Sequence, residues 1–354
     1  MSDAAAAKTR PPLSKRKRRL FAAIAFAGSA LLLLCTLEVG LTIAARDRPP
    51  NRLETGPKFE WGHSVKGVTW GHSIEINSHG FREREFTCPK PAGTFRVAVI
   101  GDSLTWGAGL ALEERYSDRL QALLRERNPE RKVEVLNFGL AGCPTAVEAG
   151  ILEHVAPKVE PDLVVVGFCV NDPKFAGSRD SQESRAWRPL LELARAPAKL
   201  GLTRSANFLH ERTWDVLVGV GAIPDWIEAL GRSYSGSEWK VFELSLARIA
   251  KVCTDRGLPQ PIFAGLLQAG TIDQIREQTD QVKAMLAWHH QALEAAERAG
   301  FRTVFFHDAL LEAFEPGTKL AVNPWDGHPG PGCNQVYAEG LLPLVEADLR
   351  RAGK

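Results

Sequence analysis

After residue 94, short continuous runs of hydrophobic residues alternate with longer stretches in which hydrophobic positions recur at helical spacing. The apolar runs lie at residues 95–101, 133–139, 162–168, 261–267 and 301–306. The helical stretches lie at about 112–127, 145–155, 239–256, 276–299 and 334–351. Runs this apolar are typical of strands buried on both faces. Their alternation with helices predicts an α/β fold with a parallel sheet between two helical layers.

Other segments do not follow this alternation. Residues 46–60 contain three prolines and mixed charges and are interpreted as a linker. Residues 61–94 place glycines between short β-type runs and predict a small hairpin-like element that packs on a main domain of residues 95–354. Residues 174–236 are rich in Arg, Trp and Ala and are interrupted by prolines. We expect them to form a helical insertion after the third strand, either a lid or a packing element.

The N-terminal part of the pattern is one apolar segment, residues 20–45, with Glu38 as its single charge. It is long enough to cross a bilayer, which needs about 20 residues. The tail of residues 1–19 carries seven basic side chains and one acid, so we expect it to stay inside and the rest of the chain outside. The long apolar run favours an uncleaved single-pass anchor, and a cleaved signal peptide with a mature chain from near Ala45 is the alternative.

Composition and charge exclude some classes of protein. The chain is 44% hydrophobic and 24% charged, as ordinary globular proteins are, and its net charge is only +2. Without the basic tail the chain is slightly acidic, so nucleic-acid binding is not expected. The six cysteines form no CxxC pair, and the spacing of His63, His72 and His79 matches no common metal motif. We therefore expect neither a metal nor an organic cofactor.

Four short motifs follow strands of the predicted sheet. The carboxyl ends of parallel strands share one edge of a sheet, so the first three motifs, which end consecutive strands, should meet there. The fourth precedes the last helix. The motifs are Gly101-Asp102-Ser103-Leu104 after the first strand, the segment from Asn137 to Gly142 after the second, Asn171-Asp172 after the third, and Asp326-Gly327-His328 after the fifth.

These motifs supply the groups that acyl transfer needs. A serine such as Ser103 is a poor nucleophile without a base, and His328 can be that base, with Asp326 to orient it. The amide of Asn171 can donate to an oxyanion. Glycines at a strand end let the backbone approach a ligand closely. Each motif alone also fits a turn or a helix cap, so the prediction depends on their joint placement.

In this order and on these elements, the four motifs resemble those of the SGNH hydrolase superfamily, also called GDSL-type esterases. The resemblance covers residues 95–350 and implies a flavodoxin-like three-layer fold with a five-stranded parallel sheet. It implies Ser103 as the nucleophile and His328 as the base. It implies an oxyanion hole made of the Ser103 N–H, the Asn171 side chain and the Gly142 N–H, with Gly139 as the second choice for the glycine.

The fourth motif departs from the usual Asp-x-x-His pattern, because the residue three positions before His328 is Trp325. Asp326, two positions before, is our choice for the acid that orients the base. Some members of the superfamily work as Ser-His dyads, which would leave Asp326 outside the machinery. His307-Asp308, at the end of the fifth apolar run, is a rival pair.

The apolar N-terminal segment, the motif that runs from Asn77 through Gly80 and Phe81 to Arg82, and the insertion resemble membrane-anchored bacterial members of the superfamily, some of them encoded with polysaccharide-modifying systems. The resemblance implies a serine hydrolase in the inner membrane with its catalytic domain in the periplasm. Its substrates would be carboxylic esters, such as O-acyl groups of a saccharide or lipid. A saccharide O-acetyltransferase with the same site is one alternative, and a non-catalytic binding protein on this fold is another.

Overall fold

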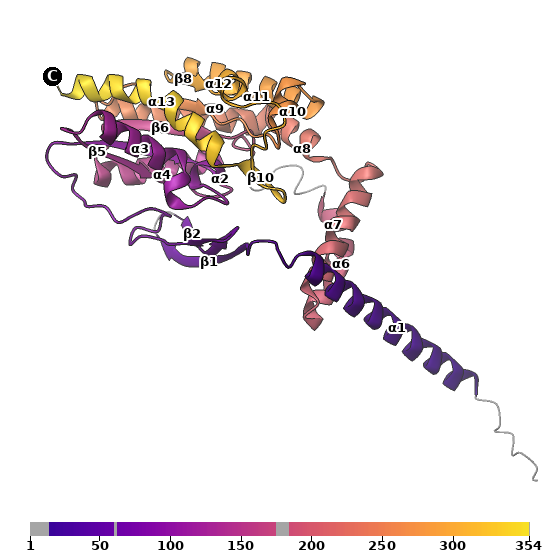
Figure 1. The fold of residues 1–354 in the computed structure, drawn as a ribbon. Helices are drawn as coiled ribbons and strands as arrows, with labels where there is room; N and C mark the ends of the chain where they lie inside the picture. Colours follow the sequence, from indigo (N-terminus) through magenta and orange to yellow (C-terminus); the bar gives the residue numbers. More distant parts are fainter. Residues whose placement is uncertain (1–13, 60–61, 175–183, 354) are drawn as a thin grey trace, which may run out of the picture. The chain divides into compact units, whose positions relative to one another are not determined.

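The five apolar runs form one parallel sheet in the computed structural model, which describes residues 14–59, 62–174 and 184–353. The strand order is β5-β4-β6-β7-β8 (Figure 1). The strands are β4 (Thr94–Gly101), β5 (Lys132–Asn137), β6 (Leu163–Phe168), β7 (Ile262–Gly265) and β8 (Arg302–Phe305). Every residue of β4, β6 and β7 is buried, as expected of strands covered on both faces. The predicted α/β fold with a five-stranded parallel sheet is confirmed.

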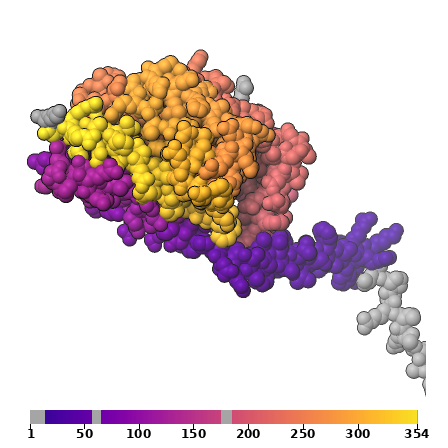
Figure 2. Space-filling model, turned by 45° about the horizontal axis from the view of Figure 1, so that its top comes forward, coloured from indigo at the N-terminus to yellow at the C-terminus, as the bar shows by residue number. Residues whose placement is uncertain are grey.

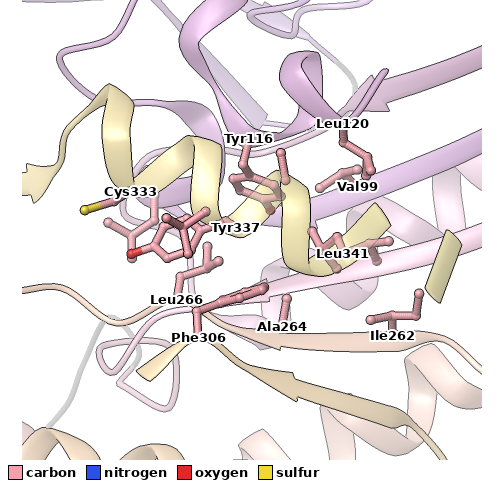
Figure 3. Close-up of a cluster of buried hydrophobic side chains, with 14 of the residues drawn as sticks. Val99, Tyr116, Leu120, Ile262, Ala264, Leu266, Phe306, Cys333, Tyr337 and Leu341 are labelled. Carbon is pink, nitrogen blue, oxygen red and sulfur yellow. The ribbon is translucent and has the colours of Figure 1, made fainter. Parts of the chain in front are cut away.

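Helices cover both faces of this sheet. They are α3 (Tyr116–Arg127) and α13 (Pro331–Ala352) on one face, and α4 (Thr145–Val159), α9 (Gly236–Asp255) and α11 (Asp280–Arg298) mainly on the other. Alternate residues of β4 enter the two cores, Val99 the first and Ile100 the second. Figure 3 shows Tyr337 and Leu341 of α13 among the side chains of the first core.

The connection between β8 and α13 contains more structure than the sequence predicts. It holds α12 (His307–Ala313) and an antiparallel pair, β9 (Ala321–Asn323) and β10 (Asp326–Pro329). Asp326 and His328 therefore lie on a short strand, and His307 opens a helix and does not end a strand. Further short helices lie elsewhere along the chain. They are α2 (Ser103–Trp106), η1 (Leu112–Glu114), α8 (Trp226–Ser233) and α10 (Ile272–Arg276).

A three-stranded antiparallel sheet precedes the main one. Its strands are β1 (Arg52–Phe59), β2 (Gly62–Thr69) and β3 (His72–Ile74). The prediction of a linker at residues 46–60 is wrong for β1. The ladder is irregular between Thr55 and Lys58, the interval that contains Pro57. Proline cannot donate a hydrogen bond to a ladder but is tolerated in edge strands, and β1 is the edge strand that pairs with β2. Its sequence, with a proline and mixed charges, therefore resembles that of a linker.

The residues cluster into two compact units. One consists of residues 1–48 and 182–223 and contains α1 (Lys15–Ala44), η2 (Ser184–Trp187), α6 (Arg188–Ala194), η3 (Ala196–Leu200) and α7 (Thr203–Gly219). The other consists of residues 49–181 and 224–354 and holds both β-structures described above. The predicted insertion, residues 174–236, thus contributes helices to both units. Its residues 175–183, like Lys8 and Arg10 of the basic tail, lie outside the described residues.

Helix α1 is long and apolar enough to be a membrane span or a signal sequence, and none of its residues is buried. Figure 2 shows the side chains in its N-terminal half uncovered on the face in view.

Candidate active site

Ser103 lies where β4 passes into the short helix α2. β4 is the first strand of the sheet and has β5 on one side and β6 on the other, so the chain reverses its direction of winding there. The crevice at such a point is the usual ligand site of open α/β sheets. The preceding residue, Asp102, is fully buried and accepts a hydrogen bond from the Leu104 N–H at 2.9 Å. This cap fixes the turn that presents the serine.

Three side chains form a chain of hydrogen bonds at this edge. His328 Nε2 lies 2.9 Å from Ser103 Oγ, and His328 Nδ1 lies 2.5 Å from Asp326 Oδ1. Asp326 Oδ1 also accepts from the backbone N–H of His328 at 3.0 Å. An imidazole protonated on Nδ1 donates to the carboxylate and leaves Nε2 free to accept the serine proton. The structure thus brings together the three residues that the sequence singled out.

Trp70 is a fourth member of this chain, and sequence reasoning missed it. It lies in the turn between β2 and β3, and its indole Nε1–H donates to Asp326 Oδ2 at 2.5 Å. Its ring stacks on Trp325, with 6.1 Å between centroids. Trp70 has a φ of +47°, which is uncommon for an aromatic residue and must be held by its surroundings. A tryptophan before a glycine in a turn gives no signal of this contact.

Asp326 is held in its ionised form. Partial burial opposes ionisation, but hydrogen bonds from His328 and Trp70 outweigh it and lower the pKa of Asp326 to about 2. A carboxylate that stays charged can stabilise the imidazolium that forms when His328 takes a proton.

The candidate oxyanion donors differ in how their N–H groups are engaged. The Gly139 N–H already donates to Asn137 Oδ1 at 2.8 Å. A Cβ on Gly139 would come within 2.6 Å of the Trp106 backbone nitrogen, so the position needs glycine for close packing. Gly142 has a φ of +74°, and no hydrogen bond to another described residue engages its N–H. Of the two glycines, only Gly142 therefore has an N–H that the described residues leave open to a ligand.

The Asn171 side chain lies beside the buried carboxyl group of Asp102, with which it shares a hydrogen bond. Its Oδ1 is buried and accepts no hydrogen bond from the described residues. An amide nitrogen carries two hydrogens, so one remains for a substrate oxygen when the other is given to Asp102.

Three acidic residues are fully buried beneath this edge, namely Asp102, Glu148 and Asp172. Burial raises the pKa of Asp102, and burial together with the neighbouring carboxyl groups raises the pKa values of Glu148 and Asp172 well above their usual range. Burial thus shifts all three carboxyl groups toward their neutral forms. Ser103 Oγ is also 3.2 Å from Asp102 Oδ2, but its one hydrogen can serve only one acceptor at a time.

Arg82 braces the segment that follows the nucleophile. Its guanidinium donates to the carbonyls of Gly107 at 2.6 Å and Leu110 at 2.5 Å, and it lies over the Trp106 ring. The Arg82 carbonyl in turn accepts from the fully buried Arg115 at 2.5 Å. The Asn77 to Arg82 motif thus has a structural task that the sequence did not predict.

The rival histidine is not part of this arrangement. His307 Nδ1 lies 2.7 Å from Asp308 Oδ1, and its buried Nε2 has no hydrogen-bond partner among the described residues. No group of three or more His, Cys, Asp or Glu side chains in those residues is arranged to hold a metal ion.

Comparisons with known proteins place this chain in a family. The model of the GDSL-like lipase/acylhydrolase family matches residues 99–335, about two thirds of the chain. Among solved structures, the chain is similar to TesA, with 16% identity over 72% of this chain and 99% of that one and a TM-score of 0.40. It is also similar to a variant of Axe2, an acetylxylan esterase from Geobacillus stearothermophilus, with 17% identity over 70% and 93% of the two chains and a TM-score of 0.42. No curated protein matches the chain. On the family match, the chain belongs to the GDSL-like lipase/acylhydrolase family and is an ester hydrolase of the SGNH type.

Proposed function

We propose that this protein hydrolyses O-acyl esters of a saccharide or lipid outside the cytoplasm, with Ser103 as nucleophile, His328 as base and Asp326 as the orienting acid. The observation that carries the proposal is the unbroken hydrogen-bond chain from Trp70 through Asp326 and His328 to Ser103. A serine that only capped a turn would need no such base, and a buried histidine that only packed would need no acid.

The chemistry follows from these contacts. Ser103 Oγ attacks the ester carbonyl carbon as its proton passes to His328 Nε2. The negative charge that develops on the carbonyl oxygen is met by the N–H groups of Ser103 and Gly142 and by the Asn171 amide. The bond to the alcohol oxygen then breaks, and the imidazolium returns the proton to the departing alcohol. A water then gives a proton to His328 Nε2 and attacks the acyl carbon. The bond to Ser103 Oγ breaks, the imidazolium returns its proton to the serine, and the carboxylic acid leaves.

The nucleophile is tested by covalent labelling. A fluorophosphonate probe should label the wild-type protein and not Ser103→Ala, whereas the exposed Ser235→Ala serves as a control that should label normally. Ser103 is only partly buried and adds little to the core, so the variant should keep its thermal stability. Equal labelling of Ser103→Ala and wild type would refute the assignment.

We further propose that α1 remains as a single-pass anchor in a bacterial inner membrane, with its basic end in the cytoplasm. Five basic residues, 15–19, open α1 ahead of its apolar part, and this is the charge bias that sets orientation. Reporter fusions after residue 50 should be active only in the periplasmic format. A soluble mature protein that begins near Ala45 would instead show a cleaved signal peptide.

The substrate class is tested by comparison of two panels. Acetylated glycans and short acyl esters of simple alcohols should both be hydrolysed if the acyl group alone is recognised. A higher kcat/KM on acetylated glycans would support a saccharide substrate, and activity on simple esters alone would argue against one.

A further inference from the structure

Glu38, the only charge in the apolar run of α1, caps another helix. Its two carboxylate oxygens accept the backbone N–H groups of Arg204 at 3.1 Å and Ser205 at 2.7 Å. These are two of the first N–H groups of α7, which lack partners within a helix, and no side chain of α7 caps them. Ser205 Oγ also donates to the Leu34 carbonyl at 3.2 Å.

The same face of α1 receives α7 over about two turns. The residues of α1 that are partly covered are Leu34, Leu37, Glu38 and Leu41, which share one face at helical spacing. Two neighbouring residues near the start of α7, Ser205 and Ala206, are buried and small, and Ser205 is one of those that contact α1. Small residues let two helix backbones approach closely, which is the usual packing of helices in a membrane.

This contact fixes where the N-terminus of α7 lies along the length of α1. The apolar run before Glu38, residues 20–37, would span roughly 27 Å as a helix, close to the thickness of a hydrocarbon core. Glu38 therefore lies at the outer boundary of the hydrocarbon if α1 spans a membrane as proposed. Residues 184–223, which we call the interfacial segment, are bound to α1 at that boundary.

The interfacial segment has an unusual surface for a water-soluble element. Seven of the 21 large hydrophobic side chains that are exposed among the described residues belong to it, although it makes up about a ninth of the chain. They are Trp187, Leu190, Leu193, Leu200, Trp214, Val216 and Val220. Its own core is three buried side chains, Leu191, Leu217 and Ile223. A core so small cannot offset the cost of exposing this much apolar surface to water.

Its charges are also those of a membrane surface element. The interfacial segment carries six basic and three acidic residues, a net charge of +3, whereas the whole chain is nearly neutral. All six basic side chains are exposed; they are Arg185, Arg188, Arg195, Lys199, Arg204 and Arg212. Helices that combine exposed apolar residues, tryptophans and basic residues lie in the boundary between headgroups and acyl chains and favour anionic lipids.

We propose that the interfacial segment is a second membrane contact of this protein: its apolar side chains lie among the acyl chains of the outer leaflet and its basic side chains bind anionic phospholipid headgroups. The Glu38 cap joins this segment to α1, the helix that lipid surrounds if α1 spans the membrane as proposed. This inference rests on the proposed anchor.

The test uses the full chain in nanodiscs of mixed zwitterionic and anionic phospholipid. Cys35 and Cys88, the exposed cysteines, are replaced by alanine, and single cysteines carry a nitroxide label. The labelled variants are Leu193→Cys and Val216→Cys in the interfacial segment, Leu32→Cys in α1 and Leu244→Cys in α9. These four leucine and valine side chains are matched in exposure, at 62–69%. Electron paramagnetic resonance then compares label accessibility to oxygen, which partitions into lipid, and to a water-soluble nickel chelate.

The expected result is that the labels at positions 193 and 216 resemble the one at 32, with oxygen favoured over nickel, while the label at 244 shows the opposite. Discs without anionic lipid should raise nickel access at 193 and 216 and leave 32 unchanged. Nickel access at 193 and 216 equal to that at 244, with 32 in lipid, would overturn the inference alone. Protection from both reagents would overturn it too, because protein would then cover the segment. A label at 32 in water would overturn the anchor itself.

Discussion

The indole N–H of Trp70 and the carboxylate of Asp326 are joined by a hydrogen bond of 2.5 Å, although 256 positions separate them in the chain. The small antiparallel sheet thus reaches the candidate active site through one side chain. Asp326 has two oxygens, and Trp70 takes the one that His328 Nδ1 leaves. The two donors together fix the plane of the carboxylate and so the direction in which it presents itself to the imidazole.

Trp70→Phe should lower kcat by roughly 10- to 100-fold with little change in KM. It removes the donor but keeps most of the ring, and a hydrogen bond to a charged group contributes roughly 1.5–3 kcal/mol. Steady-state kinetics on one activated acetyl ester measures the effect. Trp325→Phe is the matched control, because Trp325 stacks on Trp70 but is half exposed and should leave kcat nearly unchanged. Equal losses in both variants would mean that the aromatic stack, and not the hydrogen bond, matters.

Asp326→Asn should lower kcat by a factor on the order of 10²–10⁴, because it removes both the correct tautomer of His328 and the charge that stabilises the imidazolium. His328→Ala should be at least as severe, since the base itself is lost. His307→Ala should be close to wild type, because His307 pairs with Asp308.

The same three variants discriminate the alternatives. A loss of tenfold or less in Asp326→Asn beside an inactive His328→Ala would leave a Ser-His dyad. An active His328→Ala beside an inactive His307→Ala would show that the base is wrongly assigned.

The sheet could be predicted from the sequence because its strands are buried on both faces and read as continuous apolar runs, such as residues 162–168. The motifs at the strand ends were visible for the same reason, since a parallel sheet brings those ends together. Elements stabilised by distant partners were not visible. The role of Trp70 depends on Asp326 in β10, so no local pattern reports it. Strand β1 was missed for another reason: its partner β2 begins only two residues later, but Pro57 and the mixed charges make the segment resemble a linker.

The Glu38 contact illustrates the same limit. A single acid at the end of an apolar run suggests an interface position, and only the structure supplies its partners, the N–H groups of Arg204 and Ser205. A charged residue in an apolar run does indicate that partners exist, because a carboxylate there needs hydrogen-bond donors.

Asn171→Ala should reduce kcat by about 10²–10³ with a smaller effect on KM, which is the usual cost of one oxyanion donor. The side chain shares a hydrogen bond with Asp102, so the variant should also be compared with wild type by thermal unfolding, which separates loss of a donor from loss of fold. A reduction below about tenfold in a fully folded variant would remove Asn171 from the oxyanion hole.

His289 should make the stability of the protein fall in mild acid. It is fully buried, its Nδ1 lies 2.8 Å from the Met285 carbonyl, and its ring stacks on Phe305. Burial lowers its pKa from 6.5 to about 4, against the weaker opposing effect of the carbonyls of Met285 and Leu266. The folded protein therefore keeps a neutral ring between pH 6.5 and 4, where the unfolded chain takes up a proton. The stabilisation is complete above pH 6.5 and is lost as the pH falls through 4, by about 3 kcal/mol.

Denaturant unfolding at several pH values measures this effect, with His289→Gln as the comparison. The glutamine amide can still donate to the Met285 carbonyl but does not titrate, so its free energy of unfolding should fall less steeply between pH 6.5 and 4. The difference in slope is the quantity tested, and it is independent of how much the substitution costs at pH 7. Asp326 does not interfere, because its pKa of about 2 confines its own contribution to pH values below about 4. Parallel curves for the two proteins would show that His289 takes up its proton in the folded state at an ordinary pH.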